Sequence, residues 1–196
     1  MAIKVHPQGL CESDQVGDGT RVWAFAHVLP GAVVGRDCNI CDCAFIEDGA
    51  VLGDRVTVKN ATLVWRGVTC EDDVFLGPNV LFTNDLRPRS GTPFGPEDVV
   101  PTYVRRGASL GAGTVVVCGT EIGEYAFAAA GSVITRDVLP HSFVAGNPAV
   151  HKGWVGRCGA RLTQDESDDS SIWRCTGCDE AYVVDDTTGR LRPHSP

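Results

Sequence analysis

The sequence predicts an all-β protein: a parallel β-helix with one inserted loop and a small C-terminal tail. Three observations lead to this prediction. Aliphatic residues recur every six positions through most of the chain. Glycine is abundant, with 23 copies among 196 residues, and this favours many tight turns over long helices. The six-residue pattern stops once and resumes out of phase, which indicates an insertion.

The repeat begins at Val16 and is expected to end near residue 149. Its first twelve inward positions are Val16, Val22, Val28, Val34, Ile40, Ile46, Leu52, Val58, Val64, Cys70, Leu76 and Phe82. The residue four positions after each is small or β-branched in nearly every case, and Leu86 ends that second series. A period of six fits neither a helix nor a simple strand, but it fits a short strand plus a corner. Three consecutive repeats then make one triangular coil.

Stacking of such coils satisfies the backbone, because each coil covers the open hydrogen-bonding edge of its neighbour. Gly17, Gly35 and Gly53 recur at every third repeat, as expected for one corner that returns in successive coils. A chance pattern in a β-sandwich is the alternative, and the length of the repeat argues against it.

The interruption separates Phe82 from the resumed series, which is Val104, Leu110, Val116, Ile122, Ala128 and Ile134. The gap between Phe82 and Val104 is not a multiple of six. We therefore expect a loop at about residues 87–103, where the sequence RPRSGTPFGPEDVVPTY is rich in Pro and Gly. Residues 1–15 are expected to lead into the β-helix of residues 16–149, and residues 150–196 to form a tail.

Side chains that lie three repeats apart should form columns on the surface. One column is His27, Phe45, Leu63 and Leu81; the next is Leu29, Glu47, Trp65 and Thr83. Asn84 and Asp85 follow at the corner from which the inserted loop leaves. An extended loop over polar and aromatic side chains is a candidate binding site, although exposed corners also collect polar residues that have no function.

The composition narrows the classes of partner. The net charge is −8 and the isoelectric point is about 5.0, which argues against nucleic acid or an anionic membrane as the main partner. The first ten residues contain no apolar signal-peptide core, and no run of about 18 apolar residues occurs. We expect a cytoplasmic protein whose nine cysteines are reduced or hold a metal rather than form disulfides.

The pattern [LIV]-G-x-x-[STAV]-x over residues 16 to about 149 resembles that of the bacterial hexapeptide acyltransferase family. The stretches LPGAVVGRDCNICDCAFIED, VTVKNATLVWRGVTCEDDVFLGPNVLFTNDLRPRS and GNPA are similar to the subgroup that N-acylates amino sugars on nucleotide diphosphate carriers. The NIC, FIE, VWRG and FTND-LRPRS elements most resemble enzymes acting on dTDP-3-amino-3,6-dideoxyhexoses. A sister group that acts on UDP-linked 3-amino sugar acids shares much of the FTND motif and remains an alternative.

This resemblance implies a left-handed coil, a homotrimer, and active sites in the grooves between neighbouring subunits. It also implies transfer of an acyl group, usually acetyl from acetyl-CoA, to a sugar amine. Such a site must position a neutral amine beside the thioester carbonyl, donate hydrogen bonds to the oxyanion and accept a proton.

Three residues are candidates for the chemistry. Asn84 is the best candidate for orienting the amine, because its amide oxygen accepts a hydrogen bond without stabilising the ammonium form as strongly as a carboxylate would. Asp85 either accepts a proton, holds the sugar hydroxyls or caps the corner. His27, which is the only His in the central coils, is either a base, a sugar contact or a structural residue.

The candidate substrate-binding residues are Glu47, Lys59, Trp65, Arg87 and Arg89. Arg87 and Arg89 flank Pro88, and their fork-shaped guanidinium groups suit a pyrophosphate. Trp65 either stacks on the nucleotide base or packs against the coils. Lys59 either contacts a phosphate or is a surface charge.

For coenzyme A, the resemblance points to the small-residue coils that follow the insertion. Small side chains at Ala112, Gly113, Ala129, Ala130 and Gly131 would let pantetheine run along the backbone, or they simply fill corners. Arg136 stands where the family often has a cation facing the coenzyme's phosphates.

The tail contains Cys158 and the pair Cys175 and Cys178, and it resembles the zinc-ribbon tail of some relatives. Gly156 occupies the place of the expected fourth cysteine, whereas a structural zinc ion takes four ligands. Either His151 completes the site or the site is degenerate and empty. The acidic segment between the two cysteine-bearing parts, residues 163–171, and the final residues, 187–196, are expected to lack regular structure.

Two other functions remain as alternatives. A carbonic-anhydrase-like β-helix needs three clustered histidines, but His6, His27, His141, His151 and His194 are scattered. A non-catalytic β-helix scaffold is the other; it would bind no acyl-CoA.

Overall fold

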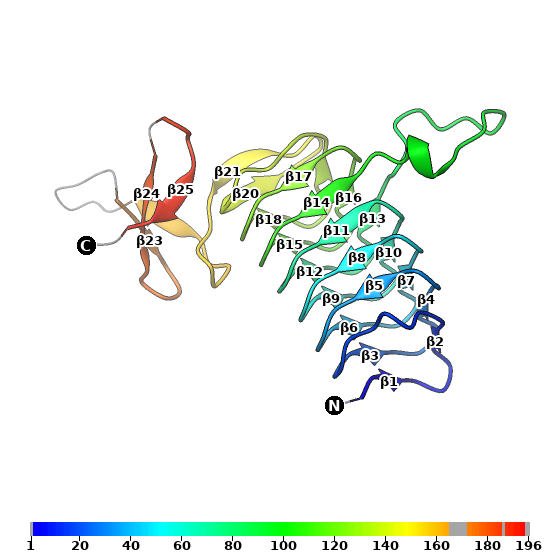
Figure 1. Ribbon diagram of the computed structural model, residues 1–196. Coiled ribbons are helices and arrows are strands. Elements are labelled where there is room, and N and C mark those ends of the chain that lie inside the picture. Colours follow the sequence, from blue (N-terminus) through cyan, green and yellow to red (C-terminus); the bar gives the residue numbers. More distant parts are fainter. Residues whose placement is uncertain (1, 165–171, 186, 195–196) are drawn as a thin grey trace.

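The computed structural model describes residues 2–164, 172–185 and 187–194. It confirms the predicted left-handed parallel β-helix, whose short strands stack into three parallel sheets along one axis (Figure 1). A one-turn 3-10 helix, η1 (Pro96–Asp98), lies in the inserted loop. Within the described ranges no helix is long and apolar enough to cross a membrane.

We name the three sheets A, B and C, and the segments that join them the A–B, B–C and C–A corners. Sheet A contains β1 (Lys4–Val5), β3 (Arg21–Val22), β6 (Asn39–Ile40), β9 (Thr57–Val58), β12 (Phe75–Leu76), β15 (Ser109–Leu110), β18 (Phe127–Ala128), β20 (Ser142–Ala145) and β21 (Val150–Trp154). Sheet B contains β2 (Leu10–Cys11), β4 (His27–Val28), β7 (Phe45–Ile46), β10 (Leu63–Val64), β13 (Leu81–Phe82), β16 (Val115–Val116) and β19 (Val133–Ile134). Sheet C contains β5 (Val33–Val34), β8 (Val51–Leu52), β11 (Val68–Cys70), β14 (Thr102–Val104) and β17 (Glu121–Ile122).

The register follows the three-repeat coil up to the insertion. His27 lies beside Phe45, Phe45 beside Leu63, and Leu63 beside Leu81 in successive strands of sheet B. In each strand of the regular coils the second of two residues points inward, and this column forms one continuous buried core. The predicted inward positions therefore hold through Phe82. Residues 1–15 also extend the β-helix, because β1 pairs with β3 and β2 with β4.

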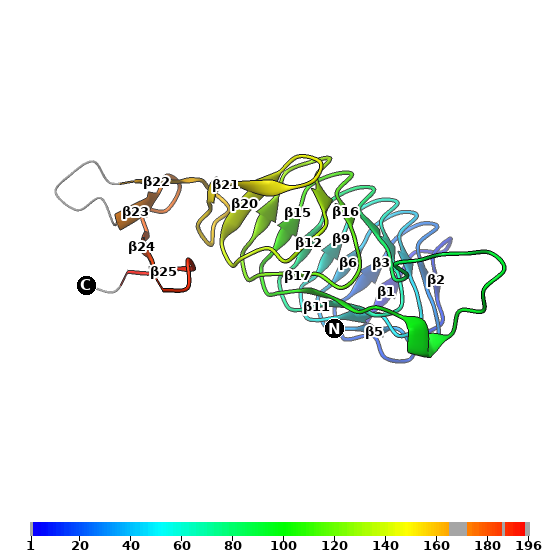
Figure 2. The ribbon, with the colours of Figure 1, turned by 90° about the horizontal axis from the view of Figure 1, so that it is seen from above.

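The insertion begins immediately after β13, earlier than predicted, and ends before β14. Leu86, which the repeat placed inside, is 57% exposed because the chain has already left the coil. At the other end, Thr102 and Tyr103 belong to β14 rather than to the loop, since they pair with Val68 and Thr69 of β11. The loop projects sideways from the coils in both views (Figures 1 and 2).

The tail continues beyond the last coil. β21 turns back and pairs antiparallel with β20, and a separate antiparallel sheet follows, with the order β22 (Leu162–Gln164), β23 (Ile172–Cys175), β24 (Ala181–Val184) and β25 (Leu191–Pro193). The expectation that the end of the chain is irregular is wrong for β25, because Leu191 pairs with Val184 and is buried. Residues 165–171 of the acidic segment lie outside the described residues.

Candidate active site

The first part of the candidate site is a cavity of about 290 Å³ between the B–C corner and the inserted loop. Glu47, Asp48, Arg66 and Asn84 line it from the corner. The loop contributes Phe94, Gly95, Pro96 and Val99. The column predicted from the sequence thus brings Glu47 and Asn84 to one cavity.

Two of these polar groups are already committed to contacts within the protein. The Glu47 carboxylate accepts a hydrogen bond from the Arg66 backbone N–H at 2.7 Å, and the Arg66 guanidinium pairs with Asp48. The Asn84 carbonyl accepts a hydrogen bond from Val100 N–H at 3.0 Å, which closes the base of the loop. No partner for the Asn84 side-chain amide occurs among the described residues, so this half-buried amide is available to a ligand.

A second cavity of about 510 Å³ lies within the loop and is lined by Asp85, Arg87 and Arg89. The Asp85 carboxylate accepts a hydrogen bond from the Arg87 backbone N–H at 2.7 Å, and Arg89 donates to the Pro88 carbonyl at 2.9 Å. The guanidinium of Arg87 has no acidic partner within the described ranges. Unpaired cations in an acidic protein are suited to an anionic ligand.

Phe94 lines both cavities, and sequence reasoning missed it. It is 46% exposed and is the aromatic residue inside the Pro- and Gly-rich excursion. An exposed aromatic ring among turn-forming residues is the signal that marks such a residue as a ligand contact.

Trp65 and His27 occupy other surroundings. The Trp65 ring packs against the core and lies 5.6 Å from the Phe45 ring, centre to centre. The His27 Nε2 atom pairs with the Glu12 carboxylate at 2.7 Å. β4 and β13 are three strand spacings apart in sheet B, so His27 lies about 14 Å below the level of Asn84. The structure does not bring His27 to Asn84 and Asp85 within one chain.

Lys59 also lies away from the loop, because it follows β9 at the A–B corner. The same corner carries the five small residues expected to bind coenzyme A: Ala112, Gly113, Ala129, Ala130 and Gly131. A Cβ atom on Gly113 or Gly131 would meet no atom within 4 Å, so this corner is open to solvent. The A–B and B–C corners are opposite edges of sheet B, about 13 Å apart.

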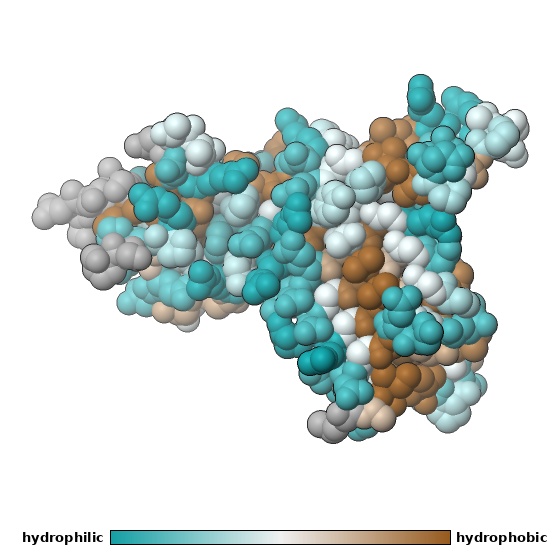
Figure 3. Space-filling model, in the orientation of Figure 1, coloured by the Kyte–Doolittle hydropathy of each residue, from teal (hydrophilic) through white to brown (hydrophobic). Residues whose placement is uncertain are grey.

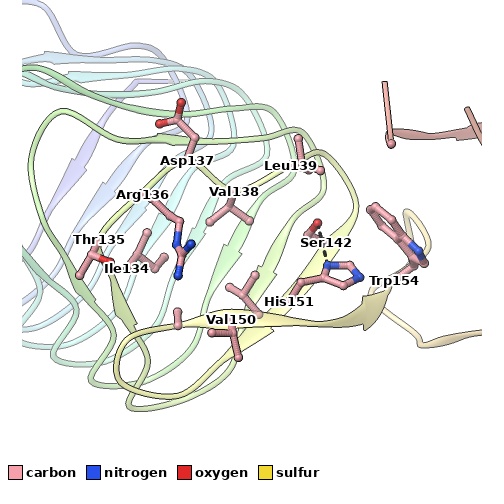
Figure 4. Close-up of a pocket in the computed structure, with 13 residues that line it drawn as sticks. Ile134, Thr135, Arg136, Asp137, Val138, Leu139, Ser142, Val150, His151 and Trp154 are labelled. Carbon is pink, nitrogen blue, oxygen red and sulfur yellow. Dashed lines mark hydrogen bonds between the residues drawn. The ribbon is translucent and has the colours of Figure 1, made fainter. Parts of the chain in front are cut away.

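Arg136, by contrast, follows β19 at the B–C corner, two strand spacings or about 10 Å above Asn84. It reaches into a pocket of about 330 Å³ between the last coil and β21 (Figure 4). Val138, Val150 and Trp154 give this pocket its apolar lining. The expected coenzyme residues are therefore divided between two edges of the same sheet.

The histidines near the end of the β-helix are structural in their contacts. The His141 ring is buried, stacks on Tyr125, and has its Nδ1 atom 3.0 Å from the Val155 carbonyl. Burial lowers the pKa of His141, although the Val155 carbonyl raises it. His151 Nδ1 lies 3.2 Å from the Ser142 hydroxyl, in the pocket of Arg136.

Three cysteines converge in the tail. The sulfur atoms of Cys158, Cys175 and Cys178 all lie within 4.8 Å of one another. His151 is not part of this cluster, so the structure does not supply it as a fourth metal ligand. A soft divalent cation fits three converging thiols by donor type.

Comparisons with known proteins agree with this fold. The family model for the bacterial transferase hexapeptide (six repeats) matches residues 15–48. The acetyltransferase domain of PglB from Neisseria gonorrhoeae, solved with acetyl coenzyme A, superposes with a TM-score of 0.56 at 22% identity and covers 77% of this chain and 58% of that chain. AntD, an N-acyltransferase from Bacillus cereus solved with dTDP and coenzyme A, gives 0.53 at 14% identity and covers 79% and 82%. These likenesses show the shared β-helix.

Sequence relatives give a more specific result. The dTDP-3-amino-3,6-dideoxy-alpha-D-galactopyranose 3-N-acetyltransferase of Aneurinibacillus thermoaerophilus is 51% identical over 158 residues, which cover 81% of each chain. The bifunctional protein GlmU of Shouchella clausii is 33% identical over 63% of this chain, which spans 25% of that protein. The resemblance seen in the repeats and the FTND motif is therefore confirmed, and the chain belongs to the hexapeptide-repeat acyltransferase family, in the group that contains the Aneurinibacillus N-acetyltransferase.

Proposed function

We propose that this protein transfers the acetyl group of acetyl-CoA to the 3-amino group of a dTDP-linked 3-amino-3,6-dideoxyhexose. The observation that supports this most directly is the unpartnered amide of Asn84, half-buried between a cavity and two loop arginines. The high identity to an enzyme of this activity over most of both chains supports the same choice of substrate.

In this proposal the acceptor occupies the two cavities at the B–C corner. Arg87 and Arg89 bind the pyrophosphate, because their guanidinium groups face a cavity that lies next to the one containing Asn84. Phe94 lies between the nucleotide and the sugar. Glu47 keeps one carboxylate oxygen for a sugar hydroxyl, while the other accepts the Arg66 N–H. Trp65 supports the corner through its contact with Phe45.

The reaction needs a neutral amine, which attacks the thioester carbonyl; the tetrahedral oxyanion then collapses and releases the coenzyme A thiolate. The Asn84 amide oxygen accepts an N–H of the amine and aims its lone pair. Asp85 accepts the proton that the amine loses, either directly or through water. His27 has no part in this step within one subunit, since it lies three strand spacings from Asn84.

The separation of the two corners leads to a proposal about assembly. Sheet B has an outward column that is apolar except for one residue: Leu10, His27, Phe45, Leu63, Leu81, Val115 and Val133. Three chains that pack sheet B around a threefold axis place the A–B corner of one subunit beside the B–C corner of the next. A homotrimer of this kind joins the small-residue corner of one chain to Asn84 and Arg136 of its neighbour.

Sheet C competes weakly for this role. Figure 3 shows an apolar band over β5 and β8, to which Val51 contributes. Further along the same sheet the outward residues are Thr69, Tyr103 and Glu121, and Glu121 pairs with Arg105. We therefore assign the subunit contact to sheet B.

Incubation with acetyl-CoA and a panel of nucleotide sugars tests the proposed function. A mass gain of one acetyl group on dTDP-3-amino-3,6-dideoxygalactose, with release of free coenzyme A, is expected. Acetylation of a UDP-linked 3-amino sugar acid in preference would overturn the choice of substrate and support the sister activity. Failure to bind any acyl-CoA in calorimetry would favour a non-catalytic scaffold.

A further inference from the structure

The cysteine cluster of the tail lies outside the candidate active site and has a geometry of its own. Cys158 follows β21 in a turn, and Cys175 and Cys178 lie at the end of β23 and in the turn after it. The Cys158 and Cys175 sulfur atoms are 3.3 Å apart. A zinc ion with Zn–S bonds of about 2.3 Å in tetrahedral geometry separates its sulfur ligands by about 3.8 Å. Shifts of a few tenths of an ångström would therefore admit the ion.

The backbone around the thiols is arranged to hold negative sulfur. Burial raises the pKa of Cys175, but hydrogen bonds from the Gly177 amide, the Cys158 thiol and the Cys178 amide outweigh it, so the pKa is lowered overall. The Glu180 amide donates to Cys178 in the same way. Amide donors aimed at sulfur are of little use to a neutral thiol, whereas they stabilise a thiolate.

The fourth side of the cluster is occupied by a glycine. A Cβ atom on Gly156 would lie 2.8 Å from the Cys175 sulfur and 3.3 Å from its Cβ atom. Position 156 therefore faces the thiols, and any side chain there would enter the cluster. Because the residue is Gly, this side of the cluster has no protein ligand among the described residues.

The tail also has little else to hold it together. The core of the tail consists of five buried residues: Trp154, Leu162, Cys175, Tyr182 and Leu191. So small a core rarely stabilises a fold without a metal or a disulfide. Cys175 belongs both to this core and to the thiol cluster, so a metal bound there would tie the turn that carries Cys158 to β23.

We propose that Cys158, Cys175 and Cys178 bind one zinc ion as three thiolates, with the fourth coordination position open on the side of Gly156. The three thiol protons pass to solvent as the ion binds. Sulfur ligands select a thiophilic cation such as zinc over magnesium or calcium. An open position admits water or a small exogenous ligand, as in zinc sites that have three protein ligands.

Metal analysis of the full chain, purified anaerobically without chelators or an affinity metal, tests the site. We expect one zinc ion per chain in the wild type and in Cys43→Ser, which changes an exposed cysteine of the β-helix. Cys178→Ser should weaken zinc binding more than about tenfold, because even an outer-shell partner is typically worth that much. Unchanged zinc binding in Cys178→Ser, absence of zinc from the wild type, or a Cys158–Cys175 disulfide in the anaerobic protein would each overturn the proposal.

Cobalt substitution of the same proteins tests the open position. The wild type should show tetrahedral cobalt bands that shift when a small thiol or azide is added. Gly156→Cys should abolish this shift and raise the sulfur-to-cobalt absorption by about one third, as four thiolates replace three. If exogenous ligands leave the wild-type spectrum unchanged, the fourth position is not open. These readouts do not depend on acetyl transfer, so they stand or fall separately from the proposed function.

Discussion

A Cβ atom placed on Gly35 would lie 2.4 Å from the carbonyl oxygen of Gly53, one coil further along the β-helix. Neither backbone can move without shifting a whole stack of coils. We expect Gly35→Ala to lower the free energy of unfolding by about 1–3 kcal/mol, the range of overpacked cores. Gly91→Ala is the matched control, because nothing lies within 4 Å of that position. Chemical denaturation of both variants measures the difference, and equal midpoints would contradict the close contact.

Replacement of Asn84 tests its role in orienting the amine. Asn84→Ala should lower kcat about 100-fold, a usual cost for losing a positioned polar group, with the fold unchanged. Asn84→Asp should retain more activity but shift the pH optimum upward, because a carboxylate stabilises the ammonium form and so raises the pKa of the amine. Steady-state assays across pH measure both effects. Full turnover by Asn84→Ala would remove this residue from the site.

The loop arginines should act on binding more than on turnover. Arg87→Ala combined with Arg89→Ala is expected to raise KM for the nucleotide sugar about tenfold or more, since charge-assisted hydrogen bonds contribute about 1.5–3 kcal/mol each. KM for acetyl-CoA should stay constant. Lys59→Ala serves as the control, because Lys59 lies at the A–B corner and away from both loop cavities. An equal rise in KM from Lys59→Ala would disprove the assignment of the pyrophosphate to the loop.

A site shared between subunits predicts complementation. Asn84→Ala disables the acceptor half at the B–C corner, and Ala130→Glu is expected to block the coenzyme half at the A–B corner. Each variant alone should be inactive, whereas mixed trimers contain interfaces with both halves intact. Co-expression should therefore restore a measurable fraction of wild-type activity. Inactive mixed trimers would show that each site is built from a single chain.

His141 should make stability depend on pH. Burial lowers its pKa in the folded protein, so the unfolded chain, with a pKa of about 6.5, takes up the proton first as pH falls. Stability is then fully present above that value and declines as pH falls toward the folded pKa. His141→Asn keeps a residue that tolerates the positive φ of 60° found there. The unfolding midpoint of this variant should change less than that of the wild type between about pH 7.5 and about pH 5.5.

Most of the β-helix was predictable because each coil makes the same demand on its sequence. An inward position such as Ile40 or Leu52 returns with every repeat, and the pairing of His27 with Phe45 follows from three repeats to a coil. The insertion ended this simple count. Leu81 pairs with Val115 on the far side of the loop, so counting three repeats forward no longer finds the partner. For that reason the sequence did not reveal that Ala112 and Asn84 lie on opposite edges of sheet B.

Other parts of the site depend on contacts that no repeat encodes. The side chain of Arg66 pairs with Asp48 across adjacent coils, and this pairing leaves Asn84 as the free polar group of the cavity. Phe94 reaches both cavities through the path of an irregular loop. β21 turns back on β20 because the repeat has ended, and it thereby builds the pocket that Arg136 enters.

The inserted loop leaves and rejoins the coil at almost the same point, where Val100 N–H meets the Asn84 carbonyl and Thr102 N–H meets that of Gly67. The coils above and below therefore stack as they would without it. Doubling the length of such an excursion costs only about 0.6 kcal/mol of closure entropy. Acceptor preference is thus carried by an exchangeable module: a chain with a different loop at this junction can acquire a new sugar specificity while it inherits the scaffold and the coenzyme half unchanged.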